Sequence, residues 1–108
     1  MQIKDLEVFN ELPFLFWVKD EAGKYLWGNR VISQLAGQEI VGKTDHELPW
    51  AADADALRVA DKQVFETAKP RFLHEYVTKP NNITLNVCKW LGDLEDKKRC
   101  FGIAFVIE

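Results

Sequence analysis

The stretch that decides the fold is residues 14–37, FLFWVKDEAGKYLWGNRVISQLAG. Two apolar segments within it, 14–18 and 25–27, are separated by Asp20-Glu21-Ala22-Gly23. An Asp side chain accepts hydrogen bonds from backbone N–H groups just ahead of it, and Gly adopts the positive φ that a tight reversal needs. The stretch therefore predicts a β-hairpin whose turn depends on Asp20 and Gly23.

Helices are predicted on both sides of this hairpin. Before it, Ile3, Leu6 and Phe9 recur at helical spacing, so a short amphipathic helix is expected over 2–10, ended by Pro13. Three helices are expected after it: Arg30–Ala36 between Asn29 as N-cap and Gly37 as left-handed C-cap, a single turn capped by Thr44 or Asp45 and limited by Pro49, and a long helix from Asp53 or Asp55 to near Ala68.

The long helix has an amphipathic pattern. Its predicted apolar stripe consists of Ala56, Leu57, Ala60, Val64 and Ala68. The polar residues Arg58, Asp61, Lys62 and Glu66 are expected to face water.

Three further strands are predicted over 71–78, 83–91 and 99–107, because loop sequences at 80–82 and 92–96 separate these segments. The first hairpin and this three-stranded meander can join as one antiparallel sheet of five strands, with the helices crossing one face. The predicted fold class is α+β. Residues 1–12 are expected to form the N-terminal helix, and residues 13–108 the domain that contains the sheet.

Composition and charge restrict the function classes. A chain of 108 residues is long enough for one domain with a single core. The net charge of −3, with no basic run, argues against nucleic acid or an anionic membrane as a partner. No apolar run is long enough to span a bilayer and no signal peptide is recognisable, so a cytoplasmic protein is expected. Cys88 and Cys100 form no metal-binding pattern; reduced, packed thiols are expected, although the two could also face each other across paired strands.

The order and spacing of these features resemble a PAS domain, the small sensory module of bacterial signalling proteins. The resemblance covers nearly the whole chain after Leu12 and rests on Asp20, Gly23, Asn29, Leu35, Gly37, Gly42, Asp61, Val64, Lys69-Pro70 and Gly102. It implies a domain that binds a small molecule non-covalently and relays the signal through dimer contacts to a covalently linked output domain, such as a kinase, a cyclase or a transcription factor. A ligand-free dimerisation and scaffolding module with a filled core is the alternative. Since PAS proteins usually continue into a connecting helix after the last strand, a piece of a longer sensor is expected.

No catalytic pattern is present in the sequence. Ser33 is the only serine, His46 and His74 are far apart, and P-loop, GxGxxG and HExxH motifs are absent, so we do not expect an enzyme. Haem-binding PAS domains ligate iron through a histidine on the long helix, which contains none here. Flavin-binding light sensors of the family use a cysteine in the stretch that matches 42–46, and this stretch has none. We therefore expect neither haem nor covalently attached flavin, nor a metal; non-covalent flavin remains open, and the cofactor is otherwise unknown.

Alternation along the strands divides the first hairpin between two faces of the sheet. The resemblance suggests that Phe16, Val18 and Trp27 look inward toward a pocket closed by the helices. The candidate ligand-binding residues are Phe16, Val18, Trp27, Leu35, Trp50, Leu57, Val64, His74 and Tyr76. A fully packed aromatic core and a solvent-facing His74 are the alternatives. Asp45 and His46 are expected to cap or flank the short helix, with a ligand role as the alternative, and Lys89 and Trp90 are read as surface and packing residues respectively.

The N-terminal helix is expected to form a dimer interface. It is too short to be stable alone in water, so it must bury its apolar stripe. A two-fold symmetric homodimer with both N-terminal helices packed over the outer sheet faces would achieve this. The alternative is that the helix covers the outer sheet face of its own chain as an intramolecular lid. The candidate interface residues are Ile3, Leu6, Phe9, Leu15 and Trp17.

Overall fold

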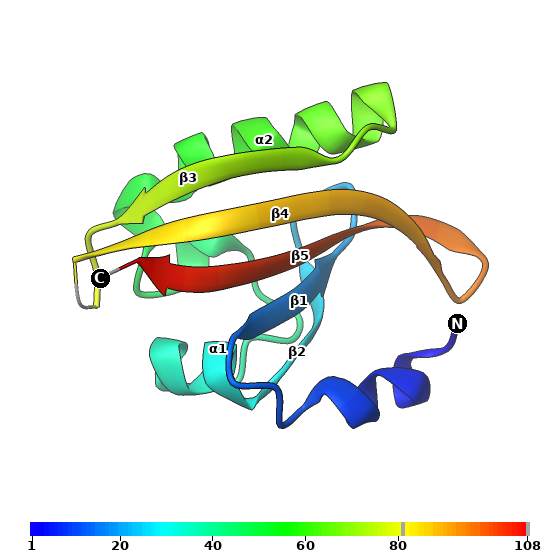
Figure 1. Ribbon diagram of the computed structural model, residues 1–108, viewed down its shortest axis with the longest axis horizontal. Coiled ribbons are helices and arrows are strands. Elements are labelled where there is room, and N and C mark those ends of the chain that lie inside the picture. The colour runs from blue at the N-terminus through cyan, green and yellow to red at the C-terminus, as the bar shows by residue number, and fades with distance from the viewer. Residues whose placement is uncertain (81, 108) are drawn as a thin grey trace.

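The computed structural model describes residues 1–80 and 82–107, and one antiparallel sheet organises this part of the chain (Figure 1). Its five strands are β1 (Leu15–Lys19), β2 (Tyr25–Gly28), β3 (Arg71–Val77), β4 (Ile83–Leu94) and β5 (Lys97–Ile107). Their order across the sheet is β2-β1-β5-β4-β3, so the N-terminal hairpin joins the C-terminal meander through the pairing of β1 with β5. The predicted α+β class and the five-stranded antiparallel sheet are confirmed.

The first hairpin turns as its sequence predicts. Gly23 has φ +86°, and the Asp20 carboxylate accepts a 2.9 Å hydrogen bond from the Lys24 N–H. A second prediction in this region is also confirmed: Asn29 caps α1 (Arg30–Ala36) by accepting from the Ile32 N–H, and Gly37 ends the helix with φ +67°. Asn29 is fully buried, and its side-chain amide donates to the Phe14 carbonyl at 2.8 Å. The same side chain therefore fixes both the start of α1 and the entry to β1.

The loop predicted over 92–96 is wrong in extent. Strands β4 and β5 continue to a two-residue turn, Glu95-Asp96, in which both residues have positive φ. Such a turn matches the twist of a hairpin. Gly92 belongs to β4, where a Cβ would lie 2.8 Å from the Phe101 ring, so this glycine makes room for an aromatic side chain. In the other predicted loop, 80–82, Asn81 lies outside the described residues.

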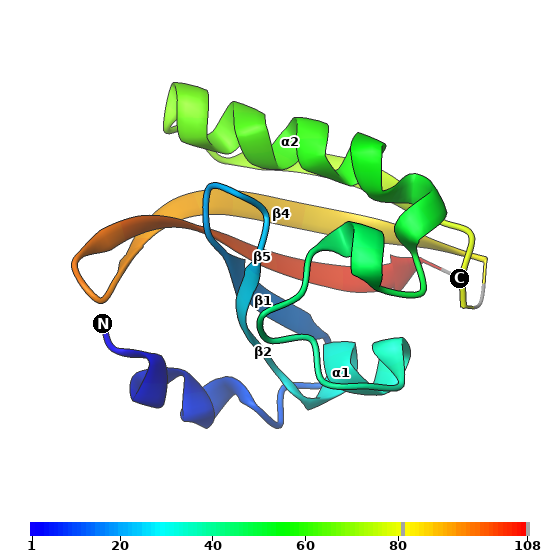
Figure 2. The same cartoon turned by 180° about the vertical axis from the view of Figure 1, so that it is seen from behind.

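The helices on one face are α1, α2 (Ala54–Thr67) and two short 3₁₀ helices, η2 (Asp45–Glu47) and η3 (Ala51–Asp53) (Figure 2). Thr44 rather than Asp45 is the N-cap of η2, and the Glu47 carboxylate accepts a 3.0 Å hydrogen bond from the Thr44 N–H. The long helix ends where Ala68 adopts φ 57°. No helix among residues 1–80 and 82–107 is long and apolar enough to cross a membrane.

The N-terminal segment is a 3₁₀ helix, η1 (Ile3–Phe9), where an amphipathic helix over 2–10 was predicted. It packs on the opposite face of the sheet from α1 and α2, and Leu6 is completely buried there. Two backbone hydrogen bonds hold its ends: the Glu95 N–H donates to the Met1 carbonyl at 2.7 Å, and the Arg30 N–H donates to the Asn10 carbonyl at 3.2 Å. The segment is therefore an integral part of the fold of one chain.

The predicted assignment of faces in the first hairpin is reversed in the structure. Phe16, Val18 and Trp27 lie under η1, in a cluster with Leu6, Leu94 and Phe101. Leu15 and Trp17 lie instead between the sheet and the helices. The reason is the pairing of Lys19, which lies on the same face of β1 as Trp17 and contacts Asp45 and Asp61 from the helices. On this face the Trp17 indole covers Gly102 of the neighbouring strand, where any side chain would collide with it.

Candidate functional site

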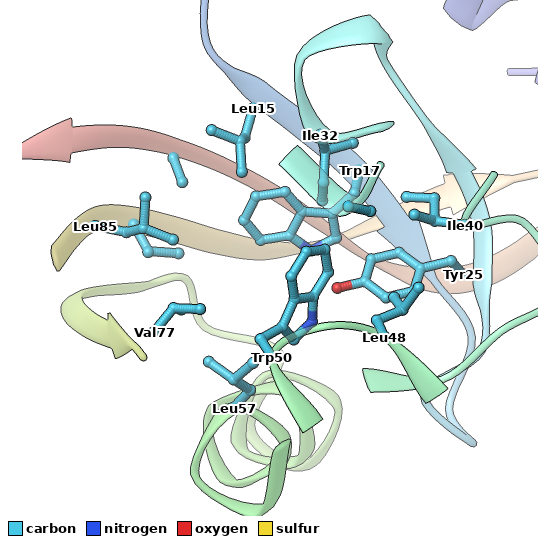
Figure 3. Packing of buried hydrophobic residues seen from close by; sticks show 13 residues of the cluster. Leu15, Trp17, Tyr25, Ile32, Ile40, Leu48, Trp50, Leu57, Val77 and Leu85 are labelled. Atoms are coloured by element: carbon cyan, nitrogen blue, oxygen red, sulfur yellow. The ribbon is translucent and has the colours of Figure 1, made fainter. Parts of the chain in front are cut away.

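A small cavity of about 30 Å³ lies between the sheet and the helices. Figure 3 shows how the buried apolar side chains pack in this region. Its apolar lining comes from both layers and consists of Leu15, Trp17, Ile32, Leu35, Trp50, Leu57, Val77 and Leu85. Four polar side chains complete the lining: Lys19, Tyr25, Glu75 and Lys89. The volume is sufficient for one or two water molecules.

The structure places the predicted ligand-binding residues in three groups. Leu35, Trp50 and Leu57 line the cavity. Val64 is buried on α2 but is not part of the cavity lining, and Phe16, Val18 and Trp27 are on the far face of the sheet. His74 and Tyr76 are exposed, because the alternation along β3 turns Glu75 inward and its two neighbours outward. Glu75 therefore occupies the position for which His74 or Tyr76 was predicted.

Lys19 is the centre of a buried charged network. Its ammonium group lies 2.6 Å from the Asp45 carboxylate and 2.8 Å from the Asp61 carboxylate, and all three side chains are withdrawn from solvent. Burial opposes the charge on Lys19, but Tyr25, Asp61 and Asp45 outweigh this effect and hold the pKa of Lys19 well above its ordinary value. Lys19 is therefore a fixed positive charge inside the domain.

Asp45 connects this network to the aromatic wall of the cavity. Its second carboxylate oxygen accepts hydrogen bonds from the Tyr25 hydroxyl at 2.6 Å and from the Trp50 indole N–H at 2.8 Å. Burial raises the pKa of the Tyr25 phenol well above its ordinary value, so Tyr25 acts as a neutral donor. The single turn η2 thus positions one carboxylate for three donors, which come from β1, β2 and the residue that precedes η3.

Lys89 extends the network across the sheet. Its ammonium group lies 2.9 Å from Asp61 and 2.6 Å from Glu75, and it donates to the Leu57 carbonyl at 3.2 Å. The contact with Glu75 is an ion pair without hydrogen-bond geometry at the Glu75 oxygen. Arg58 adds a third cation, 3.2 Å from Asp61. Three strands and two helices therefore meet through one chain of ion pairs.

The Trp17 side chain at the cavity wall has no hydrogen-bond partner among residues 1–80 and 82–107. The Trp17 indole N–H is buried and makes no hydrogen bond. An unpaired buried donor is costly and therefore uncommon. Trp17 Nε1 is thus a free donor at the wall of the cavity.

Most of this network was not among the predicted site residues, although the sequence contained a signal for it. Asp61 was expected to face water, yet it is four residues after Leu57 and three before Val64, which places it on the apolar stripe of α2. Lys89 was interpreted as a surface residue, but it is fully buried, because it alternates in register with Leu85 and Val87. In both cases the signal in the sequence was a charged residue at a position whose neighbours on the same face of the helix or strand are apolar.

The pKa of Asp61 gives a pH dependence that can be measured. Burial alone would raise this pKa, but Lys19 and Lys89 outweigh burial and lower it from 3.8 to about 2. The stabilisation by charged Asp61 is fully present above its ordinary pKa and is lost as the pH falls from about 4 to about 2, with a magnitude of about 2 kcal/mol. We therefore expect the difference in unfolding free energy between wild type and Asp61→Asn to shrink over this window in urea titrations.

Glu75 changes the stability in the opposite direction as the pH falls. Because both proteins contain Glu75, the difference between wild type and Asp61→Asn reports mainly on Asp61. Burial raises the pKa of Glu75, so protonation of Glu75 favours the folded state as the pH falls. A difference between the two proteins that stays constant from pH 5 to pH 2 would contradict the assignment.

Other chemistry-bearing residues lie outside the cavity. His46 is exposed and pairs with the exposed Asp55 at 2.9 Å. Cys88 and Cys100 are both free cysteines in the structure. Within residues 1–80 and 82–107, no group of three His, Cys, Asp or Glu side chains is placed to hold a metal ion.

Comparison with known proteins adds the family. The model of a family described as "PAS fold" matches residues 9–90. A diguanylate cyclase from Vibrio cholerae is 38% identical over 63 residues, which are 56% of this chain and 20% of the relative. The solved structure of VqmA bound to DPO has a TM-score of 0.83 at 19% identity, over 97% of this chain and 57% of that chain.

A third similar structure, the PAS domain of HTR-like protein from Haloarcula marismortui, has a TM-score of 0.74 at 17% identity, over 96% of this chain and 89% of that chain. The chain therefore spans a fifth of the cyclase and little more than half of VqmA, but nearly all of an isolated PAS domain. The family model covers most of the sheet and all of the helices that enclose the cavity. This chain belongs to the PAS fold family.

Proposed function

We propose that this PAS domain is a non-catalytic sensor that binds a small molecule non-covalently in the cavity between the sheet and the helices. The observation that carries the proposal is the presence of Lys19, Glu75 and Lys89 in the wall of an otherwise apolar cavity. Ligand sites are mostly apolar, with a few polar groups that fix the orientation of the ligand. The cavity wall has this composition.

Stability alone does not account for these charges. Replacing a buried ion network by packed apolar side chains is often neutral or stabilising. A domain selected only to dimerise would have little use for six buried or half-buried charged groups at its centre. Recognition of a polar ligand gives those groups a role.

The similar proteins support a place in signalling. VqmA, which has a similar fold, was solved with DPO bound. The diguanylate cyclase extends well beyond the segment that matches this chain. By analogy, we expect this domain to be linked in one polypeptide to an output domain, such as a cyclase, a kinase or a transcription factor, in the cytoplasm of a bacterium. Since the domain itself carries a net charge of −3, we expect the output domain and not this one to make any nucleic-acid contact.

The relay requires a homodimer contact, and the structure changes which surface we propose for it. Leu15 and Trp17 lie in the core and Leu6 is buried under its own chain, so none of these three side chains is available at the surface of one chain. The part of the outer sheet face that η1 leaves open carries Phe72, Tyr76, Phe105 and Ile107, each more than 40% exposed. Apolar patches of this kind are typical of protein interfaces. We propose that two chains pair through this open outer face.

A ligand-free scaffolding module is the second candidate. The observation that favours it is the cavity volume of about 30 Å³, which holds no molecule larger than a few atoms unless side chains move.

Native mass spectrometry of the purified protein separates the two candidates. For a sensor we expect a co-purified small mass that is lost in Leu57→Trp, because Leu57 lines the cavity and an indole would fill it. The matched control is Val59→Trp, an exposed position on the same helix, which should keep the bound mass. The same spectra report whether the chain is a dimer. Wild-type protein without bound mass, and without a thermal shift from any added metabolite, would favour the scaffold.

A further inference from the structure

The charges of the network balance. Lys19, Arg58 and Lys89 supply three positive charges, and Asp45, Asp61 and Glu75 supply three negative ones. A charged ligand that entered without displacing any of these groups would leave one charge uncompensated in a buried site, which is strongly unfavourable. An anion can therefore bind well only if it replaces one of the three carboxylates.

Glu75 is the carboxylate most easily replaced. Asp61 pairs with three cations, and Asp45 has three donors. Glu75 has one partner, Lys89, and its contact oxygen lacks hydrogen-bond geometry. Glu75 also belongs to β3, the edge strand of the sheet, and is the most exposed of the three. Its displacement would break one ion pair and would leave the contacts of the other two carboxylates in place.

Two donors among the cavity-lining residues lie on strands that flank β5. Lys89 and Trp17 stand on either side of Gly102 in the register of β4, β5 and β1, and both line the cavity. The Trp17 indole covers Gly102, and its N–H has no partner. A carboxylate accepts hydrogen bonds from several donors at once, and such charge-assisted bonds are the strong ones.

We propose that the cavity binds a short-chain carboxylate, whose carboxylate group takes the place of Glu75 on Lys89 and accepts a hydrogen bond from Trp17. This proposal rests on the proposed function and names the ligand class of the same site. The exchange keeps the network neutral, since one carboxylate leaves and another enters. It also supplies the room that the present cavity of about 30 Å³ lacks, because the Glu75 side chain moves out. The apolar walls at Leu57 and Leu85 would accept the short alkyl chain.

The test compares propionate with propionamide, an uncharged molecule of nearly the same shape, in isothermal titration calorimetry of the full 108-residue chain at constant ionic strength. Wild type should bind propionate and not propionamide. In Glu75→Ala no carboxylate has to be displaced, so propionate should bind on the order of tenfold more tightly than in wild type, or better. Lys89 keeps its ion pair with Asp61 in this variant, so the variant should remain folded.

Two controls make the test specific. Glu66→Ala removes one negative charge from an exposed position on α2 and should leave propionate affinity unchanged. The indole N–H resonance of Trp17, assigned with Trp17→Phe, should move when propionate binds, as expected for a new hydrogen bond. An equal gain of affinity in Glu66→Ala would indicate a general effect of net charge and would overturn the proposal.

The other outcomes separate this proposal from the proposed function. Propionamide binding as well as propionate would overturn the carboxylate and leave a sensor for uncharged molecules. The same conclusion would follow if Glu75→Ala bound neither probe while wild type carried another co-purified mass. If wild type carries no co-purified mass and Glu75→Ala binds neither probe, both the carboxylate proposal and the proposed sensor function would be overturned.

Discussion

Replacing Asp61 by alanine should lower the free energy of unfolding by about 3–5 kcal/mol. Asp61 is fully buried and lies within 3.2 Å of Lys19, Lys89 and Arg58. Without Asp61, the pairs of Lys19 with Asp45 and of Lys89 with Glu75 remain, but Arg58 loses its carboxylate. Three cations then face two carboxylates in the interior. The expected loss is therefore the cost of an uncompensated buried charge, which exceeds the value of the hydrogen bonds themselves.

The matched control for Asp61→Ala is Asp55→Ala on the same helix. The Asp55 side chain is 99% exposed and pairs only with His46. Exposed ion pairs contribute little, so Asp55→Ala should cost about 1 kcal/mol or less. Guanidinium titrations of the two variants measure both values. A similar small loss in both would mean that Asp61 is solvated in solution and that the network is not a buried one.

The local chemistry of the chain predicted the elements of the fold well. The turn at Gly23 and the caps at Asn29 and Gly37 adopt the conformations that their sequence indicated. These signals are local, because a turn or a cap depends on hydrogen bonds within a few residues. The ends of β4 and β5 were less predictable, since the sequence indicates a loop at Gly92, whereas in β4 this glycine leaves room for the ring of Phe101, a residue nine positions away.

The orientation of the sheet could not be obtained from alternation alone. A period of two shows which residues share a face, but not which face the helices cover. In the structure Lys19 marks the face that the helices cover. It shares this face with Leu15 and Trp17, and its buried ammonium group is paired by Asp45 of η2 and Asp61 of α2. The partners are 26 and 42 residues away in the sequence, so no local pattern shows the contact.

The same reversal explains why only three of the nine candidate ligand-binding residues line the cavity. Leu35, Trp50 and Leu57 come from helices, whose apolar stripes must face the sheet whichever way the sheet is turned. Phe16 and Trp27 depended on the choice of face and lie under η1. The prediction for His74 and Tyr76 depended on which set of alternating residues in β3 faces inward, and in the structure that set contains Glu75.

Replacing Leu6 by alanine should destabilise the protein by about 2–5 kcal/mol. Leu6 is completely buried in the cluster that η1 forms with Phe16, Val18 and Trp27. Truncation would leave a cavity between η1 and the sheet, because the two backbone hydrogen bonds at Met1 and Asn10 hold η1 in place and limit its collapse. Urea titration at a fixed protein concentration measures the loss.

Ile3→Ala is the control for this experiment, because Ile3 lies on the same short helix but is 37% exposed. It removes a side chain of the same size and should cost clearly less than Leu6→Ala. A further measurement distinguishes the packing seen here from the interface predicted for this helix. If Leu6 contributes to the fold of a single chain, its destabilisation should not change with protein concentration. If η1 instead packed against a second chain, the loss caused by Leu6→Ala would vary with concentration, because dissociation and unfolding would be linked. A concentration-dependent loss would therefore restore Leu6 to a dimer interface and contradict its place in this core.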